Sequence, residues 1–368
     1  MHLIVTANSA WNIINFRKPI IESFLQQGYK VSVIAPSDHA VKKITDMGCD
    51  YYPIQMNRSG MNPINELFFF LALKKFFKEI KPDCILSFTI KNNIFGAFAA
   101  RSLDIPFIPN ISGLGTAFMS NNLIKILVKL LYKFAFKSMN TVFFQNPDDA
   151  DLFISNKLIK SSQVALVPGS GVDLEYFSYN KLLHDDKTTF LFIGRLLVDK
   201  GINEFINAAK KVKDIYPTAH FQVLGGIDLN NRSSISNEKV ESWVSEGAVE
   251  YLGLKDDVRP FIMEATCVVL PSYREGAPRA LIEAAAMGRP LIASDVPGCR
   301  SVVEHGKNGF LCDVKDEDSL ASAFIRFINL SKHSKSNFSF ASRRKMSDEF
   351  AKEIVVKGYN AALGNINS

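Results

Sequence analysis

One stretch of the chain decides how the rest is interpreted: Tyr273-Arg274-Glu275-Gly276-Ala277-Pro278-Arg279-Ala280-Leu281-Ile282-Glu283. The apolar run at 265–270 predicts a buried parallel strand, 271–277 a loop, and 278–287 a helix whose first position holds Pro278. Glu275 then lies in the loop and Glu283 on the second helical turn. Backbone N–H groups and the helix dipole favour a phosphate at a helix start. The stretch therefore predicts a phosphate site with one carboxylate on either side.

Two more segments of the second half follow a strand-turn-helix pattern. The apolar run 189–193 is followed by Gly194 and Arg195, and Lys200 and Gly201 precede the next helical pattern. The last segment runs Ala293-Ser294-Asp295-Val296-Pro297-Gly298 and continues through Val303-Glu304-His305-Gly306 to Phe310. Together with Glu275 and Glu283, these segments resemble the retaining glycosyltransferase family 4 over about residues 188–330.

The resemblance implies the GT-B fold, in which two doubly wound, Rossmann-like α/β domains face each other across a cleft. It also implies a nucleotide-diphosphate sugar as donor. Arg195 and Lys200 match the residues that hold the donor diphosphate, Glu283 matches the ribose-binding carboxylate, and Glu275 matches the carboxylate near the donor sugar. Glu275, Arg195 and Lys200 are therefore the expected catalytic residues. The donor site implied by the resemblance consists of Gly194, Arg195, Lys200, Glu275, Gly276, Ala277, Pro278, Arg279 and Glu283.

The length of 368 residues favours two domains. Strand-like apolar runs alternate with helical patterns, as in parallel sheets covered on both faces. Strands are expected at 3–7, 30–35, 51–54, 84–88, 107–109, 141–144 and 163–167, and then near Phe190, Phe221, Glu250, Val268, Leu291 and Phe310. Helices are expected at 16–27, 64–80, 94–103 and 123–138, and past Asp316. We expect an acceptor-binding domain at 1–170, a linker at 171–187, a nucleotide-sugar domain at 188–345, and a last helix within 346–368 that crosses back to the first domain.

Several function classes are disfavoured by the sequence. No G-x-G-x-x-G motif follows the first strand and no Walker A motif is present, which argues against a dinucleotide cofactor and ATP-driven chemistry. The five cysteines are scattered singly, as reduced buried thiols are. We expect no cofactor and no metal, because two cations already face the diphosphate. The acidic pairs at 148–149 and 256–257 are expected to be helix-start charges.

The first half of the chain carries the positive charge. Residues 1–140 hold 16 Lys and Arg against 8 Asp and Glu. Lys125, Lys129, Lys133 and Lys137 recur every fourth residue in an otherwise apolar helical pattern, so they form one stripe. Lysines beside apolar residues favour contact with an anionic inner-leaflet membrane surface. A similar run at 67–78 is expected to be a crossover helix with its apolar face in the core. The footprint of nucleic-acid binding is missing.

Candidates for the acceptor side come from the first half. The segments 88–96 and 110–116 are similar to family members that build bacterial surface polysaccharides, O-antigen or capsule, or lipid-linked oligosaccharides. Many relatives have His where Thr89 or a neighbour stands, and a Gly-Gly pair where Asn8 and Ser9 stand. Ser9, Asn12 and Thr89 are candidates for contact with phosphate or acceptor.

The expected reaction is transfer of a hexose or N-acetylhexosamine to an undecaprenyl-diphosphate-linked glycan with retention of the anomeric configuration. UDP-Gal, UDP-GalNAc and UDP-GlcNAc are the expected donors, and UDP rather than GDP is a family-level preference. The N-terminus lacks the pattern of a signal peptide and no apolar stretch reaches about 18 residues, so a cytoplasmic, peripheral membrane location is expected. Two alternatives stay open: a UDP-sugar epimerase or hydrolase of the same fold, and a non-catalytic partner in a glycosyltransferase complex.

Overall fold

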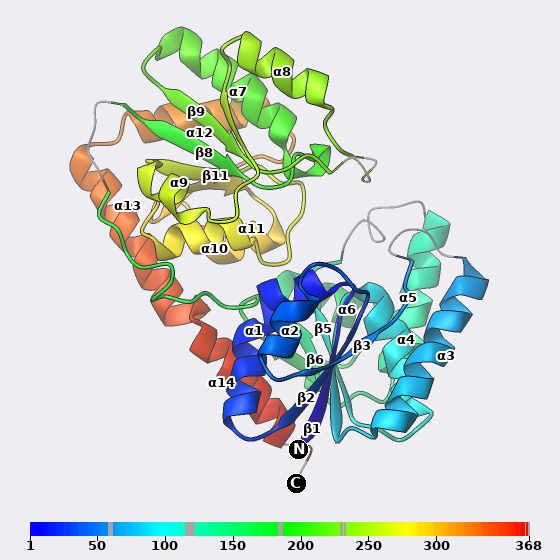
Figure 1. The fold of residues 1–368 in the computed structure, drawn as a ribbon. Coiled ribbons are helices and arrows are strands. Elements are labelled where there is room, and N and C mark those ends of the chain that lie inside the picture. Colours follow the sequence, from blue (N-terminus) through cyan, green and yellow to red (C-terminus); the bar gives the residue numbers. More distant parts are fainter. Residues whose placement is uncertain are drawn as a thin grey trace. The chain divides into compact units, whose positions relative to one another are not determined.

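The computed structural model describes residues 1–57, 62–114, 122–182, 187–228, 231, 233–364 and 366. The chain forms two compact units (Figure 1). Unit 1 comprises Met1–Ser170 and Lys352–Ser368, and unit 2 comprises Gly171–Ala351. Each unit has its own parallel sheet and its own hydrophobic core. The fold class predicted from the sequence is therefore confirmed.

Unit 1 contains a seven-stranded parallel sheet in the order β3-β2-β1-β4-β5-β6-β7. Its strands are β1 (His2–Thr6), β2 (Lys30–Ala35), β3 (Asp50–Pro53), β4 (Cys84–Phe88), β5 (Phe107–Ile111), β6 (Val142–Phe144) and β7 (Val164–Leu166). The chain runs outward from β1 to β3 and then, from β4, in the opposite direction. The neighbouring strands β1 and β4 thus mark a topological switch point, where open α/β sheets bind ligands beyond the carboxyl ends of their strands.

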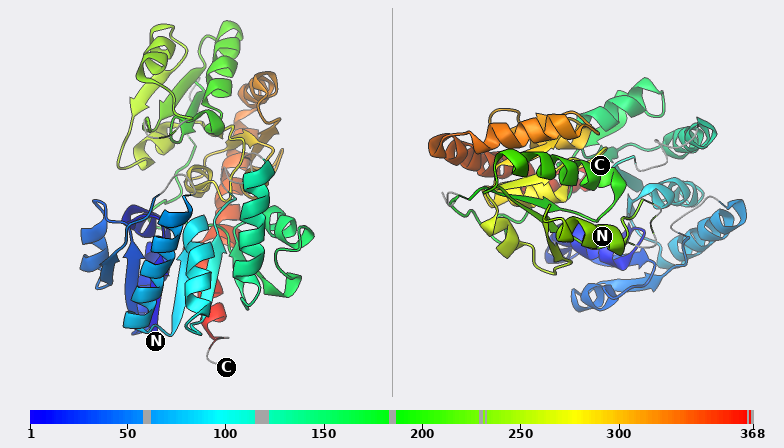
Figure 2. Two further views of the ribbon diagram at one scale, coloured as in Figure 1. Left: turned by 90° about the vertical axis from the view of Figure 1, so that its right-hand side faces the viewer. Right: turned by 90° about the horizontal axis from the view of Figure 1, so that it is seen from above.

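Helices cover both faces of this sheet. They are α1 (Ala10–Gln26), α2 (Val41–Asp46), α3 (Pro63–Ile80), α4 (Ile90–Arg101), α5 (Asn122–Phe136), α6 (Pro147–Ser155) and α14 (Lys352–Gly364). Helices α3, α4 and α5 lie side by side over one face (Figures 1 and 2). On β1, Ile4 faces their core while Leu3 and Val5 face the core under α1 and α14. This alternation is the two-residue period of a strand that is buried on both faces.

Unit 2 contains a six-stranded parallel sheet in the order β10-β9-β8-β11-β12-β13. Its strands are β8 (Thr189–Ile193), β9 (His220–Leu224), β10 (Glu250–Gly253), β11 (Cys267–Leu270), β12 (Leu291–Ser294) and β13 (Gly309–Cys312). Its helices are α7 (Ile202–Ile215), α8 (Asn237–Ser245), α9 (Arg259–Glu264), α10 (Arg279–Ala286), α11 (Pro297–Val302), α12 (Glu317–Ile328) and α13 (Lys332–Lys345). The rings of Phe190, Phe221 and Phe324 contact one another in the core between the sheet and helices α7 and α12. The five cysteines are buried free thiols, as predicted.

The predicted strands are confirmed to within two residues at their ends, whereas the starts of α1, α4 and α10 were wrong. Helix α4 begins at Ile90 instead of residue 94. Helix α1 begins at Ala10 instead of residue 16, because the Ser9 hydroxyl accepts the Asn12 N–H and caps it. Pro278 is the N-cap of α10 and not its first residue, since its ψ of 100° is extended. The helical pattern near the C-terminus is interrupted at Ala351, where ψ is 143°, so that α14 starts at Lys352.

Candidate active site

The loops after β8 and β11 meet at the carboxyl edge of the unit 2 sheet. These two strands are parallel neighbours, so their following loops lie on the same edge. The loop after β8 forms the short 3₁₀ turn Val198–Lys200, and the loop after β11 carries Glu275. The Lys200 Nζ lies 2.5 Å from the Glu275 Oε1, with side-chain exposures of 22% and 11%. Two residues 75 positions apart thus form a shielded ion pair.

Backbone packing fixes this pair in place. Gly201 follows Lys200 at φ 73°, and a Cβ built on it would lie 2.0 Å from the Pro271 carbonyl oxygen. Only glycine permits both that conformation and that approach. A Cβ on Gly298, in the first turn of α11, would lie 2.6 Å from the Glu275 carbonyl oxygen. Two loops and the start of α11 therefore pack backbone against backbone around the ion pair.

Helix α10 presents the second carboxylate. Glu283 lies on its second turn, is 8% exposed, and accepts a hydrogen bond from Arg279 Nε one turn earlier. Burial raises the pKa of Glu283, although the neighbouring Arg279 opposes the shift. Among the described residues, no side chain caps the start of α10 at Pro278. An anionic ligand oxygen suits such a helix start, which has amide donors and the positive end of the dipole.

Arg195 forms its ion pair with a different residue from Glu275. Its guanidinium is exposed and pairs with Asp228, after β9, at 3.0 Å. Its predecessor Gly194 directly follows β8 and donates its N–H to the Leu224 carbonyl. The structure thus unites Lys200 with Glu275 and Glu283 with Arg279, whereas Arg195 is held by a partner that sequence reasoning did not identify. The donor-binding roles assigned to these residues stay predictions.

Unit 1 gathers the acceptor-side candidates at its topological switch point. Ser9 and Asn12 follow β1, and Thr89 follows β4. Ser9 serves as the helix cap described above. Thr89 holds φ 76°, a costly conformation for a β-branched residue, and strained residues cluster at functional sites. The Thr89 and Asn12 side-chain oxygens are buried without a hydrogen-bond partner in the described chain.

Three buried asparagines at the same edge were not singled out from the sequence. Asn92 donates to the Thr6 hydroxyl at 2.7 Å, and Asn93 donates to the Asn110 carbonyl at 2.8 Å. Their side-chain oxygens and that of Asn110 are buried without a partner among the described residues. Asn92 and Asn93 lie in the first turn of α4, which follows the buried strand β4, and Asn110 lies inside β5. A carboxamide within or shortly after a buried apolar run is the signal that would have identified them. Positions 115–116 of the predicted acceptor segment lie outside the described residues.

Two helices of unit 1 expose apolar residues beside lysines. Ile126, Leu127, Leu130 and Phe134 of α5 are 47–58% exposed. On α3, Phe69, Leu73 and Phe77 enter the core as predicted, but four residues, Ile64, Leu67, Phe68 and Leu71, are 48–66% exposed. The prediction that the apolar face of the run 67–78 lies in the core is therefore confirmed for Phe69, Leu73 and Phe77, whereas Leu67, Phe68 and Leu71 are exposed. Among the described residues, no helix is both long and apolar enough to cross a membrane.

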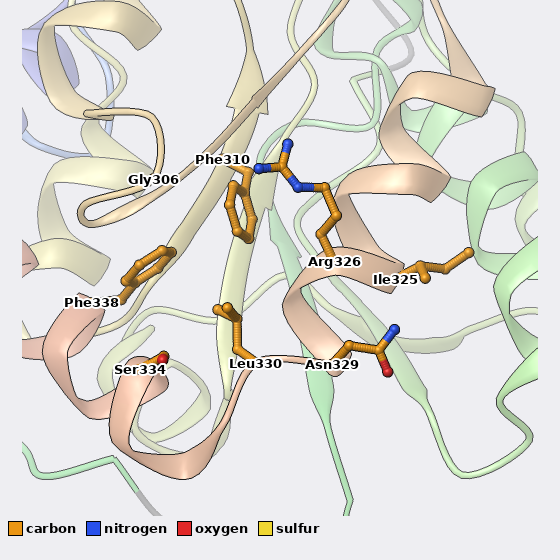
Figure 3. A pocket seen from close by; sticks show the side chains of 8 residues that line it. All are labelled: Gly306, Phe310, Ile325, Arg326, Asn329, Leu330, Ser334 and Phe338. Carbon is orange, nitrogen blue, oxygen red and sulfur yellow. The ribbon is translucent and has the colours of Figure 1, made fainter.

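A groove of ≈ 590 Å³ lies elsewhere in unit 2, beside the edge strand β13 (Figure 3). Arg326 of α12 lies over the Phe310 ring, 4.4 Å from its centroid, and Phe338 of α13 faces them from the opposite side. The groove lies between α12 and α13. It does not contain the loops that follow β8 and β11.

Comparison with known proteins assigns the chain to a family. Residues 187–329 match the family model "Glycosyl transferases group 1", and residues 3–146 match "Glycosyl transferase 4-like". A Campylobacter jejuni N,N'-diacetylbacillosaminyl-diphospho-undecaprenol alpha-1,3-N-acetylgalactosaminyltransferase is 30% identical over 87% of this chain and 88% of its own length. The chain is a family 4 glycosyltransferase. The present chain is also 27% identical to an Escherichia coli UDP-Gal:alpha-D-GlcNAc-diphosphoundecaprenol alpha-1,3-galactosyltransferase, over 70% of this chain and 69% of that relative.

The fold of the glycosyltransferase is GT-B, as the resemblance implied. The structure of Anabaena Alr3699/HepE in complex with UDP-glucose superposes with a TM-score of 0.80, at 16% identity, over 99% of this chain and 100% of that one.

Sequence reasoning missed Tyr273 and Glu204, which border the Lys200–Glu275 pair. The Tyr273 hydroxyl donates to Glu204 Oε1 at 2.7 Å across 69 positions of sequence.

Proposed function

We propose that this glycosyltransferase moves a hexose or N-acetylhexosamine from a UDP-sugar to an undecaprenyl-diphosphate-linked glycan, with retention of the anomeric configuration. The observation that carries the proposal is the shielded Lys200–Glu275 ion pair beside the open start of α10. Relatives that transfer galactose or N-acetylgalactosamine to diphospho-undecaprenol-linked sugars support this acceptor class. UDP-Gal, UDP-GalNAc and UDP-GlcNAc are the donors to test first.

The chemistry requires stabilisation of a growing negative charge. As the anomeric C–O bond breaks, charge accumulates on the diphosphate leaving group. Lys200 and the backbone N–H groups at the start of α10 provide fixed donors for it, and Arg195 adds a second cation when it leaves Asp228. Preorganised donors of this kind contribute about 3–4 kcal/mol each to transition-state stabilisation. Glu275 pairs with Lys200, the cation that the donor phosphate would engage.

The two glutamates have separate roles in this proposal. Glu283 is rigidly placed on α10, and its carboxylate suits two vicinal ribose hydroxyls. Glu275, held by Lys200, orients the hydroxyls of the donor sugar and offsets positive charge at the anomeric carbon. The acceptor hydroxyl attacks the anomeric carbon on the same face from which the phosphate leaves. The leaving phosphate accepts the proton of that hydroxyl. A product of inverted anomeric configuration, detected by NMR, would refute this mechanism.

The exposed surface of α5 fits docking to an anionic membrane. At about 100° per residue, Lys125, Lys129 and Lys133 lie between the buried side of α5 and its exposed apolar stripe. Apolar side chains in the head-group boundary with lysines beside them are typical of interfacial helices. Lys129 contacts Asn156 at 2.5 Å, and Lys137 directly follows the end of the helix. Helix α3 has a similar exposed face, because its apolar stripe continues into Lys75 and Lys78.

Binding to lipid vesicles tests this surface. Wild-type protein is expected to co-sediment with vesicles that contain phosphatidylglycerol and to be released by salt, because each lysine near an anionic surface contributes about 1 kcal/mol. The variant K133E/K137E is expected to lose most binding. The matched control K42E/K43E makes the same charge change on α2, across the sheet. Equal loss in both variants would show a net-charge effect and contradict docking through α5.

Nucleotide release tests the reaction. The protein is incubated in EDTA with a panel of UDP- and GDP-sugars, with and without a short lipid-diphosphate-linked glycan. Acceptor-dependent release from one donor would establish a metal-independent transferase and identify its sugar. Release without acceptor would favour the epimerase or hydrolase alternative. If Lys200→Met left cellular polysaccharide unchanged while deletion of the gene abolished it, the non-catalytic alternative would be correct.

A further inference from the structure

A second set of contacts joins the two loops that carry Lys200 and Glu275. The Tyr273 N–H donates to the Asp199 carbonyl at 2.9 Å, and the Ser272 hydroxyl donates to the same oxygen at 3.2 Å. The Tyr273 hydroxyl donates to Glu204 Oε1, which lies on the first turn of α7. The residue beside Lys200 and the helix that follows it are therefore both tied to a tyrosine two positions before Glu275.

We propose that Tyr273, through its hydrogen bond to Glu204, is a positioning residue that sets the distance between Lys200 and Glu275. The inference rests on the proposed function, in which these two groups act on the donor diphosphate and sugar. Among the hydrogen bonds of the described residues, none joins Tyr273 to Lys200 or to Glu275. Its role is to hold the loop after β11 against the start of α7.

The surroundings of Glu204 make the hydrogen bond from Tyr273 stronger than an ordinary packing contact. Glu204 has a second oxygen, Oε2, that is buried without a hydrogen-bond partner in the described chain. The tyrosine hydroxyl is thus the hydrogen-bond donor to a shielded carboxylate, and a hydrogen bond to a charged group contributes more than one between neutral groups. Burial and the adjacent Glu204 raise the pKa of Tyr273, so the phenol keeps its proton throughout the working range of the enzyme.

Lys315 holds the other side of the ring. Its Nζ lies 4.8 Å from the centroid of Tyr273, a cation–π distance, and it comes from the loop between β13 and α12. Removing only the hydroxyl keeps this contact and the ring packing. The Tyr273→Phe variant therefore isolates the hydrogen bond from the rest of the side chain.

Steady-state kinetics of Y273F test the proposal. We expect kcat to fall about tenfold, with the donor KM changed by less than about threefold, because a displacement below 1 Å affects the transition state more than ground-state binding. The matched control is Tyr216→Phe, which removes a hydroxyl that contacts Asn329 at 3.3 Å at the far end of α7. Glu204→Gln, which keeps an acceptor oxygen, is expected to retain more activity than Glu204→Ala. Equal falls of kcat in Y273F and Y216F, measured well below their melting temperatures, would overturn the role.

Amine labelling of Lys200 provides a readout that does not need activity. Trace acetylation followed by peptide mass spectrometry compares Lys200 with the other lysines of the same molecule. We expect Lys200 to react several-fold faster in Y273F than in wild-type or Y216F protein, since its ion pair loosens. An unchanged rate in Y273F would refute the positioning role. If the wild-type protein transfers no sugar, the proposed function fails, whereas the labelling result still decides the role of Tyr273.

Discussion

Replacing Lys200 by methionine tests whether the ion pair beside α10 is as shielded as the structure indicates. At 2.5 Å, two unit charges attract by roughly 7 kcal/mol at an effective dielectric constant of about 20, and the cost of desolvation cancels most of this gain. The methionine removes the attraction but leaves the Glu275 carboxyl group, at 11% exposure, without its cationic partner. A buried charge without its partner costs about 3–5 kcal/mol, and the remaining exposure reduces this, so we expect K200M to lose about 2–3 kcal/mol of unfolding free energy.

Urea unfolding of a double-mutant cycle measures this quantity. Glu275→Gln removes the other charge, and the double variant is expected to be about 2 kcal/mol more stable than the sum of the single changes predicts. Lys210→Met is the matched control, because its pair with Glu246 is 42% and 45% exposed and is expected to contribute less than about 1 kcal/mol. If K200M were as mild as K210M, or if the cycle were additive, the ion pair would not be shielded. In transfer assays, K200M is expected to lose about 10²–10³ in kcat.

Three further predictions follow from single features. Burial raises the folded-state pKa of Glu283 above 4.5, so the free energy of unfolding falls as pH rises through that pKa. In urea titrations, Glu283→Gln should therefore be more stable than the wild type at pH 7 but not at pH 4. The same variant should have a higher KM for the donor. Gly201→Ala places its Cβ 2.0 Å from the Pro271 oxygen and should cost about 3 kcal/mol by thermal melting, whereas Gly247→Ala, at φ +69° in open space, should cost about 1 kcal/mol. Phe134→Glu, at a 58% exposed position, should change stability by less than about 0.5 kcal/mol but lower vesicle binding about tenfold in co-sedimentation.

The strand-loop-helix units of the second half could be predicted because each lies in one continuous segment. Neighbouring parallel strands bring their following loops to one edge, so Lys200 and Glu275 meet because β8 and β11 are neighbours, and that strand order comes from the structure and not from the spacing in the sequence. The exact start of α10 could not be predicted, since proline is compatible with both the N-cap and the first helical position. The tie between Tyr273 and Glu204 depends on side-chain directions across 69 residues, which no local pattern contains.

Helix α3 shows a second limit of sequence patterns. Its segment Leu67-Phe68-Phe69-Phe70-Leu71 is apolar on every side, so helical periodicity does not identify the buried face. In the structure, Phe69 faces the core at 3% exposure and Phe68 faces solvent at 66%. The basic stripe of α5 was easier to recognise, because lysines interrupt its apolar pattern at fixed intervals. The charge pattern of α5 therefore identified its exposed face, whereas the hydrophobicity of α3 did not identify the exposed face of that helix.

The same reasoning explains why the acceptor side was harder to predict than the donor side. A diphosphate requires cations and a helix start, and such groups stand out against an apolar background as Lys200 does. An acceptor hydroxyl requires only neutral donors and acceptors, and carboxamides such as Asn92 and Asn93 also stabilise ordinary cores. What distinguishes these two is that they donate their N–H groups within unit 1 while their oxygens are buried without a partner in the described residues. Because an unpaired buried oxygen costs about 1–3 kcal/mol, a ligand hydroxyl that donated to it would recover that energy, and we therefore propose these two oxygens as a contact for the acceptor.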